Sequence, residues 1–205
     1  MPSNDAIPHT IPMISSSNLP SDEALARLAA APPFYVVSRR KLTILYLATF
    51  TLYTFYWFYK NWDRYKGKHP EASRFGTTIW PVLRAAFPMF FTHALLRKVK
   101  AHGLHLPQVA AWHSGWTATF MVAWMILSAV IDLPLQGTAG DVVSIVAIFP
   151  LLLPLLQSQR MINLVCGDPA GAGNDRLSTG HYAVIVLGCL FWLATLIGLF
   201  LPADA

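Results

Sequence analysis

The sequence predicts an all-α protein: a polytopic integral membrane helical bundle with about four transmembrane helices and one interfacial or re-entrant amphipathic helix. Hydrophobic residues make up 55% of the 205-residue chain and charged residues only 12%, about half the charged fraction of soluble domains. The charges lie in short loops between long uncharged runs, as in proteins with membrane-spanning helices. The runs do not alternate polar with apolar residues, so the pattern disfavours a β-barrel.

Two regions differ in composition. Residues 1–33 are expected to form an N-terminal tail that is disordered over its first 21 residues, because these hold four prolines and show no periodicity. Ser21 can cap a short helix that runs to Ala31 and is stopped by Pro32 and Pro33. We expect residues 34–205 to form a single helical transmembrane domain.

The first apolar run, residues 42–59, is uncharged over 18 residues, enough for a bilayer core of roughly 30 Å at about 1.5 Å per residue. Trp57, Tyr59 and Trp62 are expected at the headgroup level. Hydroxyl side chains recur at spacings of 3 or 4, which places them on one helical face. We interpret this face as a packing face that hydrogen-bonds neighbouring helices; lining of a polar pathway is the alternative. The candidate residues are Tyr46, Thr49, Tyr53 and Tyr56.

Residues 77–100 are apolar but contain Pro81, Arg84 and Pro88. This pattern favours an interfacial or re-entrant helix in which Arg84 extends to lipid headgroups. The alternative is a true span with Arg84 facing the bundle interior, at a cost of at least ~2.5 kcal/mol.

Three further spans are predicted at residues 112–133, 142–156 and 182–201, the second kinked by Pro150 and Pro154. The preference of Lys and Arg for the cytoplasmic side orients these spans and puts the C-terminus outside.

Basic residues on both sides of residues 42–59 leave three arrangements open for the front of the chain. In the first, residues 77–100 are interfacial and the N-terminal tail crosses the membrane. In the second, residues 77–100 span and five basic residues lie outside. In the third, residues 42–59 form a re-entrant hairpin and all basic segments stay inside.

A polar cluster follows the kinked span. Gln157, Arg160 and Asn163 repeat every three residues and therefore share roughly one side of a helix. Together with Arg84 they are the candidate functional cluster, suited to a lipid headgroup or an anionic solute. The alternative is that they only end the span, with Arg160 as a topology signal.

No cofactor or metal is expected. Four histidines (His93, His102, His105 and His113) lie within 21 residues but lack a nearby carboxylate or thiol. Cys166 and Cys189 should lie at different depths and stay unpaired. Residues 168–175 are expected to be a turn-rich connector. The sequence contains no catalytic motif and no acid–base pair on one face, so an enzyme is disfavoured.

Two stretches carry a resemblance to a known family. The first is VSRRKLTILYLATFTLYTFYWFYKNW followed by PVLRAAFPMFF, and the second is LLPLLQSQRMIN followed by the final span. Their YWFYKxW and QRxIN patterns are similar to those of a family of uncharacterised bacterial inner-membrane proteins, over most of residues 34–201. The front portion also resembles DUF4234-type domains. The resemblance implies location and span layout, and it leads us to expect glycine where this chain has Thr51.

These observations predict a multi-pass protein of the bacterial cytoplasmic (inner) membrane. We expect it to be non-enzymatic and to act through a membrane-protein partner or as a homo-oligomer. The alternative is a small transporter or channel component using Arg84, Gln157, Arg160 and Asn163. Because 13 of the 15 Lys and Arg residues lie in the first hundred positions, beside apolar runs, we expect contacts with the lipid bilayer and its anionic cytoplasmic headgroups, and none with nucleic acid.

Overall fold

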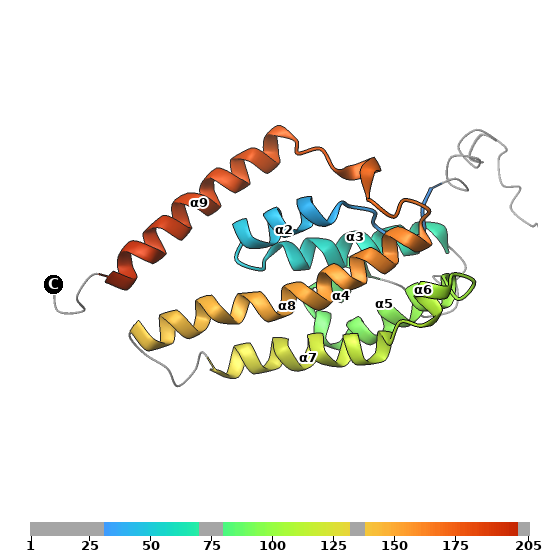
Figure 1. Cartoon of the computed structure of the whole chain (residues 1–205), viewed down its shortest axis with the longest axis horizontal. Helices are drawn as coiled ribbons and strands as arrows, with labels where there is room; N and C mark the ends of the chain where they lie inside the picture. Colours follow the sequence, from blue (N-terminus) through green and yellow to red (C-terminus); the bar gives the residue numbers. More distant parts are fainter. Residues whose placement is uncertain (1–30, 70–79, 132–137, 201–205) are drawn as a thin grey trace, which may run out of the picture. The chain divides into compact units, whose positions relative to one another are not determined.

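The structure is a computed structural model that describes residues 31–69, 80–131 and 138–200. The chain divides into two compact units between Ala31 and Pro32. All the described helices belong to the second unit. The helix predicted before Pro32 lies outside the described residues. Every regular element in the described ranges is a helix (Figure 1), which confirms the all-α class there. The helices are α2 (Arg39–Ala48), α3 (Tyr53–Lys68), α4 (Pro81–Ala86), α5 (Pro88–His102), α6 (Pro107–Ala110), α7 (Ser114–Ile131), α8 (Thr138–Val165), the 3₁₀ turn η3 (Ala172–Asn174) and α9 (Thr179–Phe200).

Two helices of the described part are long and apolar enough to cross a membrane. They are α8 over Gly140–Val165, with a mean hydropathy of 1.9, and α9 over Thr179–Phe200, with a mean hydropathy of 2.5. Helix α7 is apolar over Ser114–Val130 but shorter. The structure thus shows two candidate membrane-spanning helices rather than four.

Helix α8 continues past the predicted end at residue 156, through both of its prolines. A proline inside a helix removes the donor to the carbonyl four residues earlier, which for Pro150 is that of Val146, and it bends the helix locally. Just before Pro150, the carbonyl of Ala147 accepts from Trp124 Nε1 at 2.8 Å and that of Ile148 accepts from the Tyr46 hydroxyl at 2.6 Å. Side chains of α7 and α2 therefore support α8 beside the proline.

Residues 42–59 do not form the continuous helix that the first two of the three arrangements require. The chain reverses at Thr49–Leu52, where Phe50 and Thr51 adopt positive φ angles of 49° and 73°. Thr49 joins the two helix ends, because its Oγ1 donates to the carbonyl of Leu45 at 2.8 Å and accepts from the backbone N–H of Tyr53 at 2.8 Å. The run is thus a helical hairpin, which composition alone does not reveal.

Helix α9 packs against the reversal. A Cβ on Gly188 would meet the carbonyl oxygen of Ala48 at 2.1 Å, so only glycine allows this approach. Trp192 stacks on Phe50 with ring centroids 4.3 Å apart and donates from Nε1 to the carbonyl of Leu47 at 2.9 Å. The last carbonyls of α2 have no donors within the helix. Trp192 of α9 supplies a donor for one of them, the carbonyl of Leu47.

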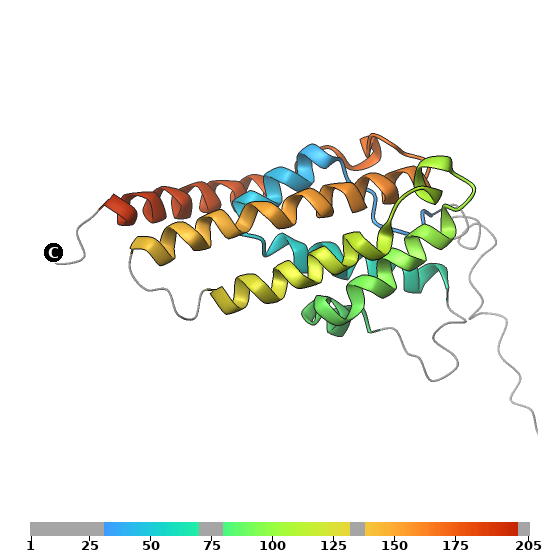
Figure 2. The ribbon, with the colours of Figure 1, turned by 60° about the horizontal axis from the view of Figure 1, so that its bottom comes forward.

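Residues 77–100 do not form one helix either. Helix α4 ends at Phe87, whose φ of −119° and ψ of 61° are not helical, and Pro88 begins α5. Helix α5 then runs alongside α7 in the opposite direction (Figure 2). Residues 77–79 lie outside the described part.

The core gathers large aromatic side chains from the start of the unit and from α3. Phe34, Tyr46, Trp57, Phe58 and Trp62 are fully buried. Trp57 and Trp62 therefore pack inside the protein rather than on its surface, and their expected depth at the headgroup level stays a prediction.

The hairpin brings basic residues from distant parts of the chain toward one end of the bundle. Helices α3, α5 and α8 end at one end of the bundle, and α2 and α9 begin closer to the middle of its length, on the side toward that end (Figures 1 and 2). Most basic residues of the described ranges lie in these first or last two turns or in the adjoining loop: Arg39, Arg40, Lys41, Arg64, Lys66, Lys68, Arg97, Lys98, Lys100, Arg160 and Arg176. Lys60 and Arg84 are the described exceptions.

The reversal predicts a stabilising substitution. A β-branched residue with positive φ costs roughly 1–2 kcal/mol, so Thr51→Gly should raise the free energy of unfolding by about 0.5–1 kcal/mol, after the larger unfolded-state entropy of glycine is subtracted. Denaturant unfolding in detergent measures this.

The matched control is Thr43→Gly, which places the same substitution inside α2. Because threonine is already a weak helix former, glycine within the helix should lower the free energy of unfolding by about 0.3–0.5 kcal/mol. If both variants lose stability to the same extent, the reversal at Thr51 is contradicted.

Candidate functional site

The most concentrated polar site surrounds residues 34–38, here named the pre-helix segment. This segment precedes α2 and is neither helix nor strand. It is nevertheless buried: Phe34 and Val37 are 0% exposed, and Tyr35 and Ser38 are 6% exposed. Buried backbone groups outside regular structure need partners from elsewhere. Side chains that fold against the segment must therefore supply them.

Four amide side chains do so, and we name them the amide clamp: Asn61, Gln159, Asn163 and Asn174. Asn61 Oδ1 accepts from the N–H of Tyr35 at 3.2 Å, and Gln159 Nε2 donates to the carbonyl of Tyr35 at 3.0 Å. Asn174 donates to the carbonyl of Val36 at 2.9 Å. Asn163 donates to the carbonyl of Val37 at 3.0 Å. The clamp thus joins α3, α8 and the loop before α9 to one short segment.

The orientation of the clamp amides is itself fixed by hydrogen bonds. Gln159 Oε1 accepts from Trp57 Nε1 at 2.5 Å, and Gln159 Nε2 also donates to Asn163 Oδ1 at 2.7 Å. Asn61 donates to the carbonyl of Trp57 at 2.9 Å. A fully connected buried network of this kind is stable, whereas a partly satisfied one is costly. Removing one member should therefore weaken the whole site.

The loop after α8 is shaped to present Asn174. The N–H groups of Gly173 and Ala172 donate to the Asp168 carboxylate at 2.8 and 2.9 Å and hold the pKa of Asp168 below its usual range. Gly171 adopts a φ of +70°, and a Cβ there would meet the carbonyl oxygen of Val37 at 2.5 Å. The expected turn-rich connector is thus closed around its own aspartate and lies directly on the pre-helix segment.

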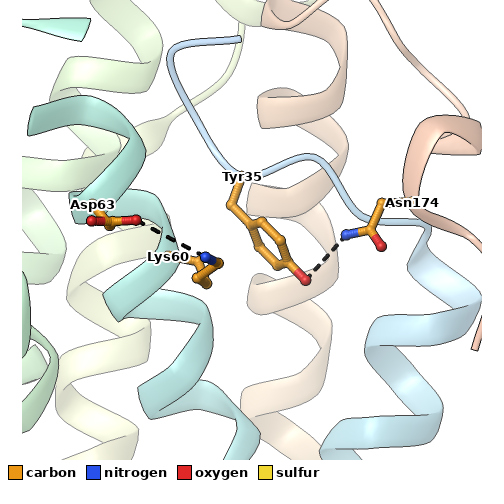
Figure 3. Close-up of polar contacts among 4 residues, drawn as sticks. All are labelled: Tyr35, Lys60, Asp63 and Asn174. Atoms are coloured by element: carbon orange, nitrogen blue, oxygen red, sulfur yellow. Dashed lines mark hydrogen bonds and ion pairs between the residues drawn. The ribbon is translucent and has the colours of Figure 1, made fainter. Parts of the chain in front are cut away.

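Asn174 links the clamp to the start of α3 through Tyr35 and to the start of α2 through Lys41. Asn174 donates to the Tyr35 hydroxyl at 3.1 Å, as Figure 3 shows, and that hydroxyl also lies 3.2 Å from the Tyr53 hydroxyl. Lys41 is 4% exposed, and its Nζ donates to Asn174 Oδ1 and to the carbonyl of Arg176, both at 2.8 Å. In the same view, Lys60 and Asp63 form an ion pair at 4.0 Å on α3, which contributes little because both side chains are partly exposed.

The four candidate residues taken from the sequence do not converge. The Arg84 guanidinium lies 4.3 Å from the ring centroid of Trp62 and 4.9 Å from that of Phe91. Gln157 is exposed and accepts weakly from Thr117 Oγ1 at 3.4 Å, and Arg160 is exposed. Asn163 is fully buried in the clamp. Of the three residues chosen for their spacing of three, Gln157 and Arg160 are exposed and Asn163 is buried. They therefore do not form one site.

The hydroxyl face of residues 42–59 is split by the reversal. Tyr46 is fully buried and bonds α8, and Tyr53 is 7% exposed and lies beside Tyr35. Thr49 serves the turn. Tyr56 is 44% exposed and makes an edge contact with the Tyr35 ring. The hydroxyls of Tyr46, Thr49 and Tyr53 thus have partners within the chain, but they do not share one face of a single helix.

The sequence patterns did not identify three of the four clamp residues as candidates: Gln159, Asn61 and Asn174. Gln159 and Asn163 stand four residues apart and lie on the same face of α8, which is a usable signal. Asn61 and Asn174 carry no such signal, because their partners lie 26 and 138 residues away.

The described histidines and cysteines do not gather at one place. His102 lies 3.2 Å from His69 between their Nε2 atoms, whereas His93 pairs with Thr119 on α7 at 3.1 Å. Cys166 and Cys189 are both free thiols. Burial raises the pKa of the Cys166 thiol to about 11, and its Sγ lies 3.8 Å from the carbonyl of Phe34. Cys166 therefore stays protonated at neutral pH and packs as part of the segment's surroundings.

Removing one amide of the clamp should lower the free energy of unfolding. Asn163→Leu keeps a similar volume but leaves the carbonyl of Val37 without its donor and removes an acceptor from Gln159. An unpaired buried group costs roughly 1–3 kcal/mol, so the free energy of unfolding should fall by about 2 kcal/mol or more. Thermal or denaturant unfolding in detergent measures the change.

Gln157→Leu is the control, because it makes the same type of change on the exposed side of α8. It should alter stability by no more than about 0.5 kcal/mol. Equal losses in the two variants would show that the clamp does not stabilise the unit.

Comparisons with known proteins assign no relative. No protein-family model matches the chain, and no curated protein or solved structure matches it. The resemblance to bacterial inner-membrane proteins therefore stays a prediction.

Proposed function

We propose that the chain is a multi-pass protein of the bacterial cytoplasmic membrane that acts without catalysis, by associating with another membrane protein or with a second copy of itself. The observation that carries this proposal is the surface of α9. This helix is apolar over 22 residues, and within it Gly188 alone is buried. An apolar helix with so little internal packing is suited to contact lipid and other helices.

Opposite sides of α9 differ in exposure, which supports packing on α2 by one side and association by the other. Together with the buried Gly188, the half-buried residues follow spacings of 3 and 4 along the side that packs on α2: His181, Ile185, Trp192, Thr195 and Leu199. On the opposite side, Val186, Leu190, Leu193 and Ile197 are 52–58% exposed. We name these four residues the outer face of α9 and propose it as the association surface.

The charge distribution supports the orientation. With residues 42–59 folded as a hairpin, the basic residues before and after them lie toward one end of the bundle, which suits a cytoplasmic, anionic headgroup layer. A hollow of about 310 Å³ on this side is lined by three basic residues and one acidic residue: Arg40, Lys41, Arg176 and Asp175. We propose that this end faces the cytoplasm, with α7, α8 and α9 crossing and α2–α3 re-entrant.

The alternative function, a small transporter or channel component, has less support. Such a pathway needs polar groups that converge, but Arg84, Gln157, Arg160 and Asn163 have different partners. The amides of the clamp are already engaged with the pre-helix segment.

Site-specific photo-crosslinking in the native membrane tests association. A photoreactive amino acid at Val186, Leu190 or Leu193 should give one discrete protein adduct or a homodimer, because these positions face away from α2. The same amino acid at Ile185, on the α2 side, is the matched control and should give no intermolecular adduct.

Association is contradicted if every outer-face position yields lipid adducts alone. It is also contradicted if the purified protein moves ions or solute in proteoliposomes and loses that activity on substitution of Arg84 or Arg160 by alanine. Under the proposal, these two substitutions leave flux at the level of empty liposomes.

A further inference from the structure

Two arginine side chains line the hollow between the start of α2 and the start of α9. The hollow has a volume of about 310 Å³ and is closed on one side by the loop before α9. Arg40 on α2 and Arg176 in this loop are both exposed. Neither guanidinium has a hydrogen bond, an ion pair or a ring contact with another described residue. Both groups are therefore accessible to a ligand.

The other charged side chains of the hollow already have partners. Lys41 Nζ donates to Asn174 Oδ1 and to the carbonyl of Arg176, and the Asp175 carboxylate accepts from Ser38 Oγ. Among the described residues that line the hollow, Asp175 is the single acidic one, against three basic ones. The excess of positive charge attracts an anion, and the two arginines have donors left to bind it.

The positions of the donors favour one class of anion. The planar fork of arginine donates two parallel hydrogen bonds to the oxygens of a phosphate or a carboxylate. Tyr182, on the first turn of α9, also lines the hollow, and its hydroxyl has no hydrogen-bond partner among the described residues. These donors come from three elements and therefore from different directions. The tetrahedral oxygens of a phosphate can accept from them all, whereas a planar carboxylate cannot.

The length of α9 sets the depth of the hollow in a membrane. From Tyr182 to Phe200 the helix rises about 27 Å at about 1.5 Å per residue, close to the roughly 30 Å of a hydrocarbon core. When α9 crosses the membrane, Tyr182 lies at the interface, where tyrosine is enriched. Ile44 and Leu177 also line the hollow and give it an apolar part beside the phosphate-binding groups.

We propose that this hollow binds a phosphate group, held by the guanidinium groups of Arg40 and Arg176 and by the hydroxyl of Tyr182. The same group occurs in anionic lipids and in soluble phosphate esters, and the depth and the apolar part of the hollow favour the lipid. The site rests on the membrane location proposed above, but it does not require association through the outer face of α9.

The test uses the full-length protein in phosphatidylcholine nanodiscs that contain phosphatidylglycerol with a photoreactive diazirine at the start of one acyl chain. Adducts should map to Ile44, Leu177 or Tyr182, which line the hollow. Diacylglycerol with the same diazirine chain lacks the phosphate and should label these residues at least tenfold less.

Competition identifies the source of the phosphate. Unlabelled phosphatidylglycerol should remove the labelling. Glycerol 1-phosphate, added to the aqueous phase, should also remove it if the hollow accepts soluble phosphate esters, and should leave it unchanged if the hollow selects the lipid. Either result supports a phosphate site.

Two double variants separate this site from a general attraction of lipid to basic residues. Arg40→Gln combined with Arg176→Gln removes both guanidinium ligands and should reduce the labelling at least tenfold, because hydrogen bonds to charged groups are lost. Arg64→Gln combined with Arg160→Gln is the matched control. Both of these side chains are exposed, near the ends of α3 and α8, so the protein loses the same charge and labelling should stay within twofold.

Thermal unfolding checks the variants, and the first double variant should unfold close to the temperature of the unsubstituted protein, because its two side chains are exposed. The proposal is overturned if phosphatidylglycerol and diacylglycerol label the hollow equally, or if both double variants lose labelling to the same extent. A protein that does not enter nanodiscs contradicts the membrane location as well. A protein that enters them without preferring phosphatidylglycerol contradicts the phosphate site alone.

Discussion

The structure depends on one constraint: a short, non-helical stretch of backbone is buried and must be hydrogen-bonded. The pre-helix segment cannot satisfy its own groups, because it forms neither helix nor strand. Asn61, Gln159, Asn163 and Asn174 supply the partners from α3, α8 and the loop before α9. Each bond contributes roughly 1 kcal/mol, and each unpaired group would cost more. The clamp therefore fixes which parts of the helices meet and sets where α2 begins.

The reversal at Thr49–Leu52 follows from the same arrangement. Once the pre-helix segment is held between α3 and α8, α2 leaves it toward the opposite end of the bundle and the chain must return through α3. Positive φ angles at Phe50 and Thr51 allow the turn, and Trp192 and Gly188 of α9 cover it. The hairpin places the basic residues before and after it toward one end. This geometry favours the third of the three arrangements left open by the sequence, the re-entrant hairpin.

Composition and periodicity predicted the helical class and the approximate positions of α7, α8 and α9, because long uncharged runs have few other structures. They did not locate the break in residues 42–59, since Phe50 and Thr51 are not turn residues. The basic residues on both sides of this run left a hairpin open as one of three arrangements, but they did not show where the chain reverses. Asn163 was selected with Gln157 and Arg160 at a spacing of three, whereas its buried companion is Gln159 at a spacing of four. Asn174 could not be found, because its role depends on a loop folding onto a segment 138 residues earlier.

The hairpin, rather than a simple first span, is the central claim, and cysteine accessibility tests it most directly. In a chain whose Cys166 and Cys189 are replaced by serine, single cysteines would replace the exposed Arg40, Arg64 and Arg97. A membrane-impermeant maleimide should modify all three from the cytoplasmic side, and a cysteine at Leu52, in the reversal, should not react from that side. Modification of positions 40 and 64 from opposite sides of the membrane would show that residues 42–59 cross it, and would contradict the account.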